Sequence, residues 1–157
     1  MEVIIRKGKP ADFPALLGLI KELALFEKEP DAVTNSVEQM QQEQQHFEFY
    51  VAEHDGEIIG AAVYFFAYYT WVGKSMYLDD LYVKPEYRRQ KVGSKLIRKI
   101  FQIAQTEKCQ RLRWQVLDWN TDAIEFYKKL GAKVSSEWLN CDCHASDIAE
   151  FLARKST

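Results

Sequence analysis

The feature that most constrains the fold is the stretch of residues 76–94, which predicts a strand, a tight turn and a helix start. The apolar run at 76–83 has the length and composition of a strand buried on both faces. Pro85 ends this strand, because proline has no N–H to donate to a neighbouring strand. An amphipathic helix then begins at about Val92. The stretch therefore predicts one strand–turn–helix unit, around which we arrange the rest of the chain.

Two acids, Asp79 and Asp80, interrupt the apolar run at its centre. Since side chains alternate along a strand, we expect these two carboxylates to point to opposite faces of the sheet. A carboxylate in a buried run is costly enough that at least one of the pair should have a purpose. We assign a substrate role to Asp79 and a structural role to Asp80, and the alternative is that both bind loop backbone.

The turn after the strand is basic and contains one glycine, Gly93. Free N–H groups at a helix start and the positive end of the helix dipole both favour an anion such as phosphate. Glycine allows the backbone to approach such a ligand closely. On these residues alone, however, a solvated basic helix start is the better interpretation. The basic residues are Lys84, Arg88, Arg89, Lys91, Lys95, Arg98 and Lys99.

Size and composition limit the remaining possibilities. A chain of 157 residues fits one domain, so we expect a single domain over 1–157. A net charge of -2 argues against a nucleic-acid partner, whose binding surface would be basic. No apolar segment is long enough to span a bilayer, and the first residues lack the apolar region of a signal peptide. We therefore expect a cytoplasmic protein without a membrane partner.

Cysteine usage fits a reducing compartment and predicts no metal site. The chain has 3 cysteines, Cys109, Cys141 and Cys143, which cannot form a disulfide framework. The Cys141-Asp142-Cys143-His144 stretch offers too few well-spaced ligands for a closed zinc site.

Periodicity and turn signals predict a mixed α/β (α+β) fold. Strands linked by a hairpin turn at Asp55-Gly56 come first and strand–helix–strand crossovers follow, which favours a mixed sheet of about seven strands with helices on both faces. We expect Ser36 and Asn120 to cap helices. The expected strands lie at 3–5, 47–53, 58–69, 76–83, 111–117, 132–134 and 138–143, and the expected helices at 11–27, 36–45, 92–107, 121–130 and 147–154, the last capped by Ser146.

Two further residues admit a structural and a functional interpretation. Glu27 continues the apolar stripe of the first helix, and a solvated acid at a frayed helix end is the better interpretation from spacing alone. Tyr127 lies on the apolar stripe of its helix, where a tyrosine usually belongs to the core.

Several stretches resemble one known family. Arg88-x-x-Lys91-x-Gly93 resembles the Q/R-x-x-G-x-G/A loop with which GNAT N-acetyltransferases cradle the pyrophosphate of acetyl-CoA, although Lys91 replaces the first glycine. The resemblance is greatest to the spermidine/spermine and thialysine N-acetyltransferases and covers nearly the whole chain. It is carried by LIKELALFE (19–27), TWVGK (70–74), YLDDLYV (77–83), VLDWN (116–120) and FYKKLGA (126–132).

The resemblance implies a GNAT fold, acetyl-CoA as co-substrate and no metal. It implies that Tyr127 acts as the general acid that protonates the departing thiolate of CoA. It also implies that the first glycine position, here lysine, lies where backbone approaches the pyrophosphate. The implied cofactor-binding residues are Leu81, Tyr82, Val83, Arg88, Arg89, Gln90, Lys91, Val92, Gly93, Ser94, Asn120, Ala123 and Tyr127.

The resemblance also implies how the amine is bound. Asp79 matches a glutamate that binds the amine and helps to remove its proton, and Phe26 and Glu27 match an aromatic–acid pair that contacts substrate. Carboxylates can hold an alkylammonium ion and then take its proton, and the rings of Trp71 and Phe26 can face the cation. We therefore expect a small cationic substrate, namely a polyamine, a diamine or a lysine-like amine, acetylated directly in a ternary complex.

Two alternatives remain open. The first is a protein acetyltransferase of the same fold, acting on lysine side chains or N-termini through an open peptide groove. The second is an acyl-CoA-binding module without catalysis, which Lys91 in the glycine position favours and the presence of Tyr127 and Asp79 disfavours. The resemblance further implies a homodimer with the C-terminal strands near the partner.

Overall fold

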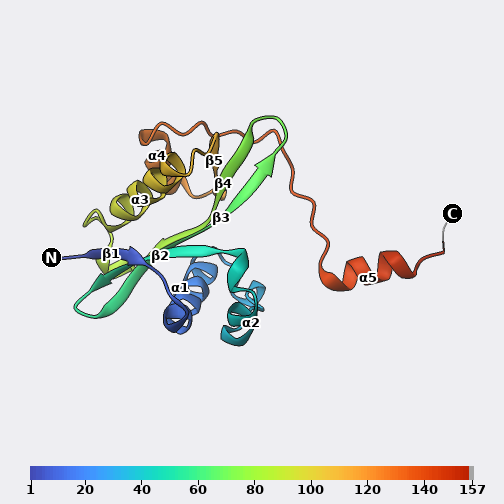
Figure 1. Ribbon diagram of the computed structural model, residues 1–157, viewed down its shortest axis with the longest axis horizontal. Helices are drawn as coiled ribbons and strands as arrows, with labels where there is room; N and C mark the ends of the chain where they lie inside the picture. Colours follow the sequence, from blue (N-terminus) through green and yellow to red (C-terminus); the bar gives the residue numbers. More distant parts are fainter. Residues whose placement is uncertain (156–157) are drawn as a thin grey trace. The chain divides into compact units, whose positions relative to one another are not determined.

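The computed structural model describes residues 1–155 (Figure 1). The chain divides into two compact units, Met1–Leu117 and Asp118–Thr157, and each is described by itself. In the described part of the chain, no helix has both the length and the apolar character needed to cross a membrane.

The first unit is built on a five-stranded mixed sheet with the strand order β1-β2-β3-β4-β5. The first four strands pair antiparallel, and β4 pairs parallel with β5. Asp55 and Gly56, with φ of 49° and 77°, form the tight turn between β2 and β3, as the sequence predicted. The strands are β1 (Ile4–Lys7), β2 (Glu48–His54), β3 (Glu57–Tyr69), β4 (Gly73–Val83) and β5 (Arg111–Arg113).

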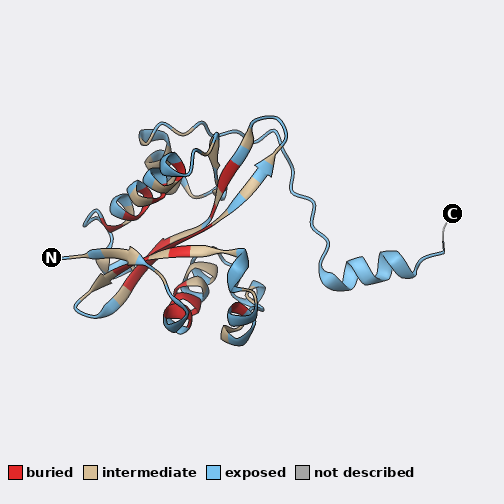
Figure 2. Ribbon diagram, viewed as in Figure 1, coloured by how far each residue is buried: buried red, intermediate tan, exposed pale blue. Residues whose placement is uncertain are grey.

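Helices cover both faces of this sheet, which confirms the expected layering (Figures 1 and 2). On one face, α1 (Phe13–Phe26) and α2 (Val37–Gln42) pack on alternate residues of β2 and β3. We call this the α1 face. Its core includes Phe13, Leu16, Leu17, Leu19, Met40, Phe49, Val51, Ala61, Val63 and Tyr82.

On the other face, α3 (Val92–Thr106) buries Leu96, Ile97 and Ile100. Gly60 allows α3 to pack closely, since a Cβ there would lie 3.3 Å from Leu96 Cδ1. Short 3-10 turns, η1 (Pro10–Asp12), η2 (Pro30–Ala32), η3 (Gln44–His46) and η4 (Pro85–Tyr87), connect the elements.

A partly buried ion-pair network fixes the start of α1 to the sheet edge. Two guanidinium nitrogens of Arg6 donate to the Asp12 carboxylate at 2.8 and 3.0 Å, and Arg6 Nε donates to Glu53 at 2.8 Å. The backbone N–H of Lys9 donates to the same Asp12 carboxylate at 2.9 Å. These hydrogen bonds lower the pKa of Asp12, although its burial acts in the opposite direction.

The second unit contains two helices, and the structure corrects several expectations there. Asn120 caps α4 (Thr121–Lys129) by accepting from the Ala123 N–H at 3.3 Å, as predicted. α5 (Ala145–Ala153) begins after His144, so the predicted cap at Ser146 is wrong.

The strands expected at 132–134 and 138–143 are also wrong, and the strand expected at 111–117 ends at Arg113. A strand requires a neighbour for its backbone groups, and within the described residues this segment has none. Its apolar side chains are correspondingly exposed, with Trp138 at 80% and Leu139 at 88%. The sheet therefore has five strands instead of about seven.

Candidate active site

The central strand β4 has an edge that is only partly paired. Its parallel register with β5 covers Ser75, Met76 and Tyr77, while β4 itself continues to Val83. The Lys84 N–H points to β3, where it donates to the Ile59 carbonyl at 2.9 Å. Because N–H directions alternate along a strand, the N–H groups of Leu81 and Val83 point away from β3, toward this open edge. An extended ligand can therefore pair with β4 in place of a strand.

The turn after β4 adopts a backbone conformation that normally requires glycine. Arg89 and Lys91 have φ of 61° and 64°, in the left-handed region that side chains disfavour. Lys91 replaces the first glycine of the sequence motif, so its conformation explains why the motif has glycine there. With lysine at this position, the backbone still adopts the left-handed conformation that glycine would adopt.

The N-terminus of α3, which follows this turn, is open to an anion. Lys91 occupies the N-cap position, and its side chain makes no capping hydrogen bond to the first-turn N–H groups of α3. A Cβ added at Gly93 would lie 3.8 Å from Val83 Cγ2, an ordinary contact, so packing within the chain does not require this glycine. The space beside Gly93 is instead available to a ligand.

Arg88 joins the turn to the end of β4 and to the end of α1. Its Nε donates to the Val83 carbonyl at 2.9 Å. Its guanidinium lies 5.2 Å from the Phe26 ring centroid and 5.3 Å from that of Tyr82. Arg88 is thus engaged by the protein itself and positions the loop, which leaves the next residues of the turn for a phosphate.

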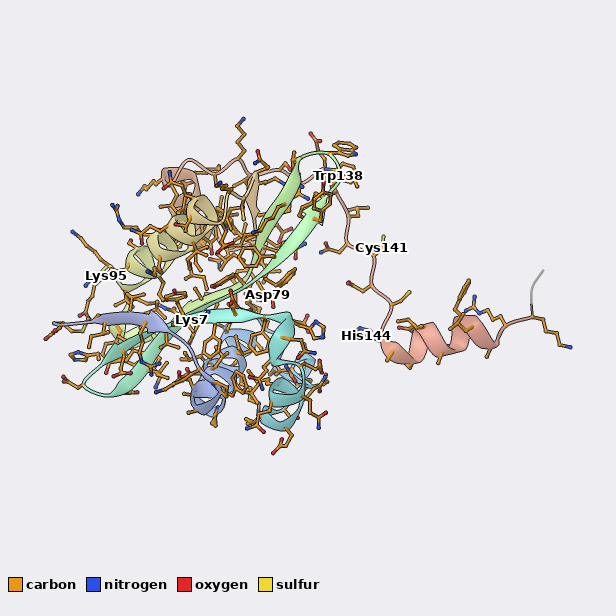
Figure 3. All side chains as sticks on the ribbon, in the orientation of Figure 1. Lys7, Asp79, Lys95, Trp138, Cys141 and His144 are labelled. Carbon is orange, nitrogen blue, oxygen red and sulfur yellow. The ribbon has the colours of Figure 1, made fainter. Side chains whose placement is uncertain are left out.

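A β-bulge in β4 places two carboxyl groups together. Val63 of β3 is opposite Asp80, whereas the next residue, Tyr64, is opposite Leu78, so Asp79 is the extra residue. The expectation that the two acids point to opposite faces is therefore wrong, because the bulge breaks the alternation of side chains. Instead, the carboxyl group of Asp80 donates a hydrogen bond to that of Asp79. Asp79, labelled in Figure 3, lies on β4 in the body of the first unit.

A third acid, Glu27, completes an acidic cluster with this pair. Glu27 caps the C-terminal end of α1, and its charge acts on Asp80. Burial, together with repulsion from Asp79 and Glu27, raises the pKa of Asp80 to about 7. Desolvation also raises the pKa of Asp79 and that of Glu27. A cation at this cluster would relieve the repulsion, and its carboxyl groups can exchange a proton near neutral pH.

Asp80 is the member that the sequence interpretation missed as a site residue. Burial and the neighbouring acids raise its pKa to about 7, whereas the sequence interpretation assigned it a structural role. The sequence does contain a signal for it, namely two adjacent acids inside an apolar run. One acid would suffice for a contact with loop backbone, so the second indicates a site.

The structure does not bring Trp71 to the acidic cluster. It lies in the turn between β3 and β4, where its side chain is 87% exposed. Val63, opposite Asp80, and Tyr69, at the start of that turn, are separated along β3 by roughly 20 Å at about 3.4 Å per residue. Phe26, by contrast, lies at the α1 end next to Glu27 and is 42% exposed.

Three predicted residues, Asn120, Ala123 and Tyr127, lie at the start of α4 or within it, in the second unit. Asn120 and Ala123 form the capping contact of that helix. Tyr127 is half-buried, and its ring centroid lies 5.5 Å from that of Phe126. Among the described residues, no group of three His, Cys, Asp or Glu side chains is arranged to hold a metal ion.

Known proteins resemble this chain in sequence and in fold. Residues 16–132 match the family model described as the acetyltransferase (GNAT) family. A thialysine N-epsilon-acetyltransferase from Sus scrofa is 42% identical over 147 residues, covering 86% of both chains. A spermidine/spermine N(1)-acetyltransferase-like protein from Homo sapiens is 32% identical, covering 85% of this chain and 21% of its own length.

A solved structure is similar in fold. It is an aminoglycoside N-acetyltransferase in complex with CoA, with a TM-score of 0.72 and 17% identity, covering 92% of this chain and 96% of that one. At this identity, the match concerns the fold alone.

Proposed function

Because this chain belongs to the acetyltransferase (GNAT) family, we propose that it transfers an acetyl group from acetyl-CoA to a primary amine of a small, lysine-like cationic substrate. The expected family, fold class and N-acetyltransferase activity are confirmed by the family match and by the curated relatives. The observation that carries the choice of substrate is the acidic cluster of Glu27, Asp79 and Asp80, which lies on β4 and at the end of α1.

The residues around the open edge of β4 fit acetyl-CoA. The outward N–H groups of Leu81 and Val83 suit the amide-containing pantetheine arm, and Tyr82 between them anchors the strand to the core. The free N–H groups at the start of α3 suit the pyrophosphate. Acetyl-CoA supplies the activated thioester. The residues proposed to hold it are Leu81, Tyr82, Val83, Arg89, Gln90, Lys91, Val92, Gly93 and Ser94, with Arg88 as a positioning residue and with Asn120, Ala123 and Tyr127 from α4.

The acidic cluster performs two tasks in this proposal. It binds the ammonium form of the substrate, because three carboxyl groups attract a cation. It then accepts a proton, because an ammonium ion has no lone pair with which to attack a carbonyl carbon. Asp80, with a pKa of about 7, is suited to accept a proton at neutral pH, and Asp79 is its hydrogen-bonded partner. Phe26, next to Glu27, is proposed as an aromatic contact of the substrate.

Tyr127 is proposed to act at the leaving group. A phenol O–H can donate a proton or a hydrogen bond to the departing thiolate, which makes the thiolate a better leaving group. The proposal depends on the family resemblance, since spacing alone places Tyr127 on the apolar stripe of its helix, where it would belong to the hydrophobic core.

The left-handed conformation of Lys91 bears on the non-catalytic alternative. The lysine was the feature that favoured a binding module, yet its φ of 64° keeps the backbone in the conformation that glycine would adopt. Nothing about the loop path therefore argues against a productive cofactor site.

Three further proposals concern the whole chain. Both units belong to one acetyltransferase domain, 1–157, since the family match at 16–132 crosses their boundary. The chain forms a homodimer, in which a second copy covers apolar side chains such as Trp138, Leu139, Phe151 and Leu152, all exposed. The protein acts in the cytoplasm, where Cys109, Cys141 and Cys143, all free, would stay reduced.

The experiment that tests the function is a thiol-release assay with acetyl-CoA and a panel of amines. The panel contains thialysine, lysine, putrescine, spermidine, spermine and a histone-tail peptide. We expect turnover with the small amines. Activity on the peptide alone would establish the protein-acetyltransferase alternative, and CoA binding without turnover of any amine would establish the binding module.

A further inference from the structure

A second polar cluster lies on the same sheet face as the acidic cluster, toward the β3–β4 turn. Arg111 and Arg113 of β5 both stack on the ring of Tyr69, with guanidinium carbons 4.5 and 5.2 Å from its centroid. The two arginines are two residues apart on a strand, so their side chains leave the same face. We call these three residues the arginine–tyrosine cluster.

The charges of these arginines are not neutralised within the described chain. Neither Arg111 nor Arg113 forms an ion pair with a carboxylate among residues 1–155. Arg111 Nε is also buried without a hydrogen-bond partner in the same part of the chain. A buried guanidinium N–H without a partner is unfavourable, so a ligand that accepts hydrogen bonds would stabilise the cluster.

The strand register shows that both clusters share the α1 face. Phe65, Tyr77 and Arg113 are neighbours in one row across β3, β4 and β5, and the Phe65 and Tyr77 rings stack with centroids 5.2 Å apart. Phe65 lies two residues from Val63, which packs on the α1 face opposite Asp80. Residues two apart on a strand share a face.

Tyr77 lies between the two clusters and responds to both. The charges of Asp79 and Asp80 raise the pKa of its hydroxyl, and the charge of Arg113 lowers it. Along β3, the Asp80 row lies roughly 7 Å from the Arg113 row and roughly 14 Å from the Arg111 row, at about 3.4 Å per residue, and both guanidinium groups extend beyond these rows toward Tyr69. A lysine-like amino acid held at the acidic cluster therefore extends toward Arg113, the nearer of the two arginines.

We propose that Arg111 and Arg113 bind the carboxylate of an amino-acid substrate whose side-chain amine lies in the acidic cluster. The enzyme then selects lysine-like amino acids over polyamines and diamines. This inference rests on the function proposed above and adds the residues that determine its specificity.

The chemistry at the two ends of the substrate accounts for the selection of amino acids over diamines and polyamines. A guanidinium donates two parallel hydrogen bonds to a carboxylate, and Tyr69 holds both guanidinium groups in place. A diamine or polyamine would place a second ammonium group near two unpaired arginines, which repels it. Tyr77 and Phe65 supply a flat apolar floor for the methylene chain between the two ends.

The first test uses the unaltered enzyme and pairs of substrates that differ only in the carboxylate. The pairs are lysine with cadaverine, and thialysine with the diamine that its decarboxylation would give. Lysine amide, which keeps the α-carbon but not the negative charge, is the third comparison. We expect kcat/KM for the amino acids to exceed that for their partners roughly 10- to 100-fold. Equal values across each pair would overturn the proposal while leaving the proposed function intact.

The second test uses Arg113→Gln, since Arg113 is exposed and its replacement leaves the core unchanged. We expect kcat/KM for lysine and thialysine to fall roughly tenfold or more, with the diamines unchanged or improved. Arg98 is an exposed arginine on α3, and Arg98→Gln is the matched control. It should change kcat/KM neither for the amino acids nor for the diamines. Arg111→Gln/Arg113→Gln should remove the remaining preference, with circular dichroism to verify folding.

The two proposals fail in different ways. Loss of activity on amino acids and diamines alike in Arg113→Gln, with folding intact, would show that the arginines do not act on the carboxylate. Absence of activity on every amine in the unaltered enzyme would instead contradict the proposed function.

Discussion

Asp79 and Asp80 are adjacent on β4, and the bulge between them brings their carboxyl groups into a shared hydrogen bond. Two carboxyl groups this close resist simultaneous ionisation, and their protons are lost as a coupled pair. The protein thus holds a carboxyl pair that keeps a proton near neutral pH, at a place where a cationic amine would displace it.

Replacing Asp79 with Asn should reduce kcat/KM for cationic amines by about two orders of magnitude. The change removes a negative charge from the amine site and the hydrogen-bond acceptor of Asp80. Steady-state kinetics with thialysine measures the effect. Asp31→Asn, at an exposed aspartate in η2, serves as the control. Unchanged kinetics in Asp79→Asn would remove this residue from the mechanism.

Replacing Tyr127 with Phe should lower kcat by one to three orders of magnitude, of the size typical for lost general acid catalysis. The phenyl ring keeps the packing against Phe126, so the affinity for CoA should change little. Calorimetric titration with CoA and turnover measurements separate the two quantities. Tyr68→Phe, at a tyrosine that is 76% exposed, is the matched control. A parallel loss of affinity and turnover would show that Tyr127 serves packing only.

Replacing Lys91 with Gly should leave activity in place and increase the free energy of unfolding by up to about 1 kcal/mol. Glycine adopts a φ of 64° without the steric strain that lysine has there. Lys95→Gly provides the contrast, because Lys95 lies inside α3 and glycine should destabilise that helix by about 1 kcal/mol. Denaturant unfolding gives both values. Loss of CoA binding in Lys91→Gly would mean that the lysine side chain itself holds the phosphate.

Replacing Asp12 with Asn should lower the free energy of unfolding by about 1.5–3 kcal/mol at neutral pH, the range for hydrogen bonds to charged groups. The change leaves Arg6 with only Glu53 as an acidic partner. Because the Arg6 guanidinium lowers the pKa of Asp12, the wild-type advantage should persist above about pH 4 and disappear as the pH falls through that lowered pKa. Glu48→Gln, which breaks the exposed Lys7–Glu48 pair, should change stability by less than about 0.5 kcal/mol. A pH-independent difference would contradict this account.

Much of the first unit could be predicted from the sequence, because its signals are local. Apolar periodicity located α1 and α3, the Asp55-Gly56 turn located the hairpin, and Ser36 accepts from the Gln39 N–H at 3.1 Å as its capping pattern predicted. In each case the residues that determine the element lie within the element itself.

The features that could not be predicted depend on partners distant in sequence. The bulge at Asp79 exists only relative to the register with Val63 and Tyr64. Arg111 was expected only as part of a strand, since its stacking on Tyr69 depends on how β5 lies beside β4. The strand expected at 138–143 rested on the local sequence alone, which does not supply the neighbour that a strand needs.

The most direct test of the account is the pH dependence of kcat/KM in the unaltered enzyme and in Asp80→Asn. Burial and the neighbouring acids raise the pKa of Asp80 to about 7, so the amine site should lose its negative charge below that pH. We predict that kcat/KM of the unaltered enzyme falls by up to tenfold per pH unit below about 7, and that Asp80→Asn is less active and lacks this acidic limb. The same acidic limb in both proteins would contradict the claim that the carboxyl pair on β4 binds and deprotonates the amine.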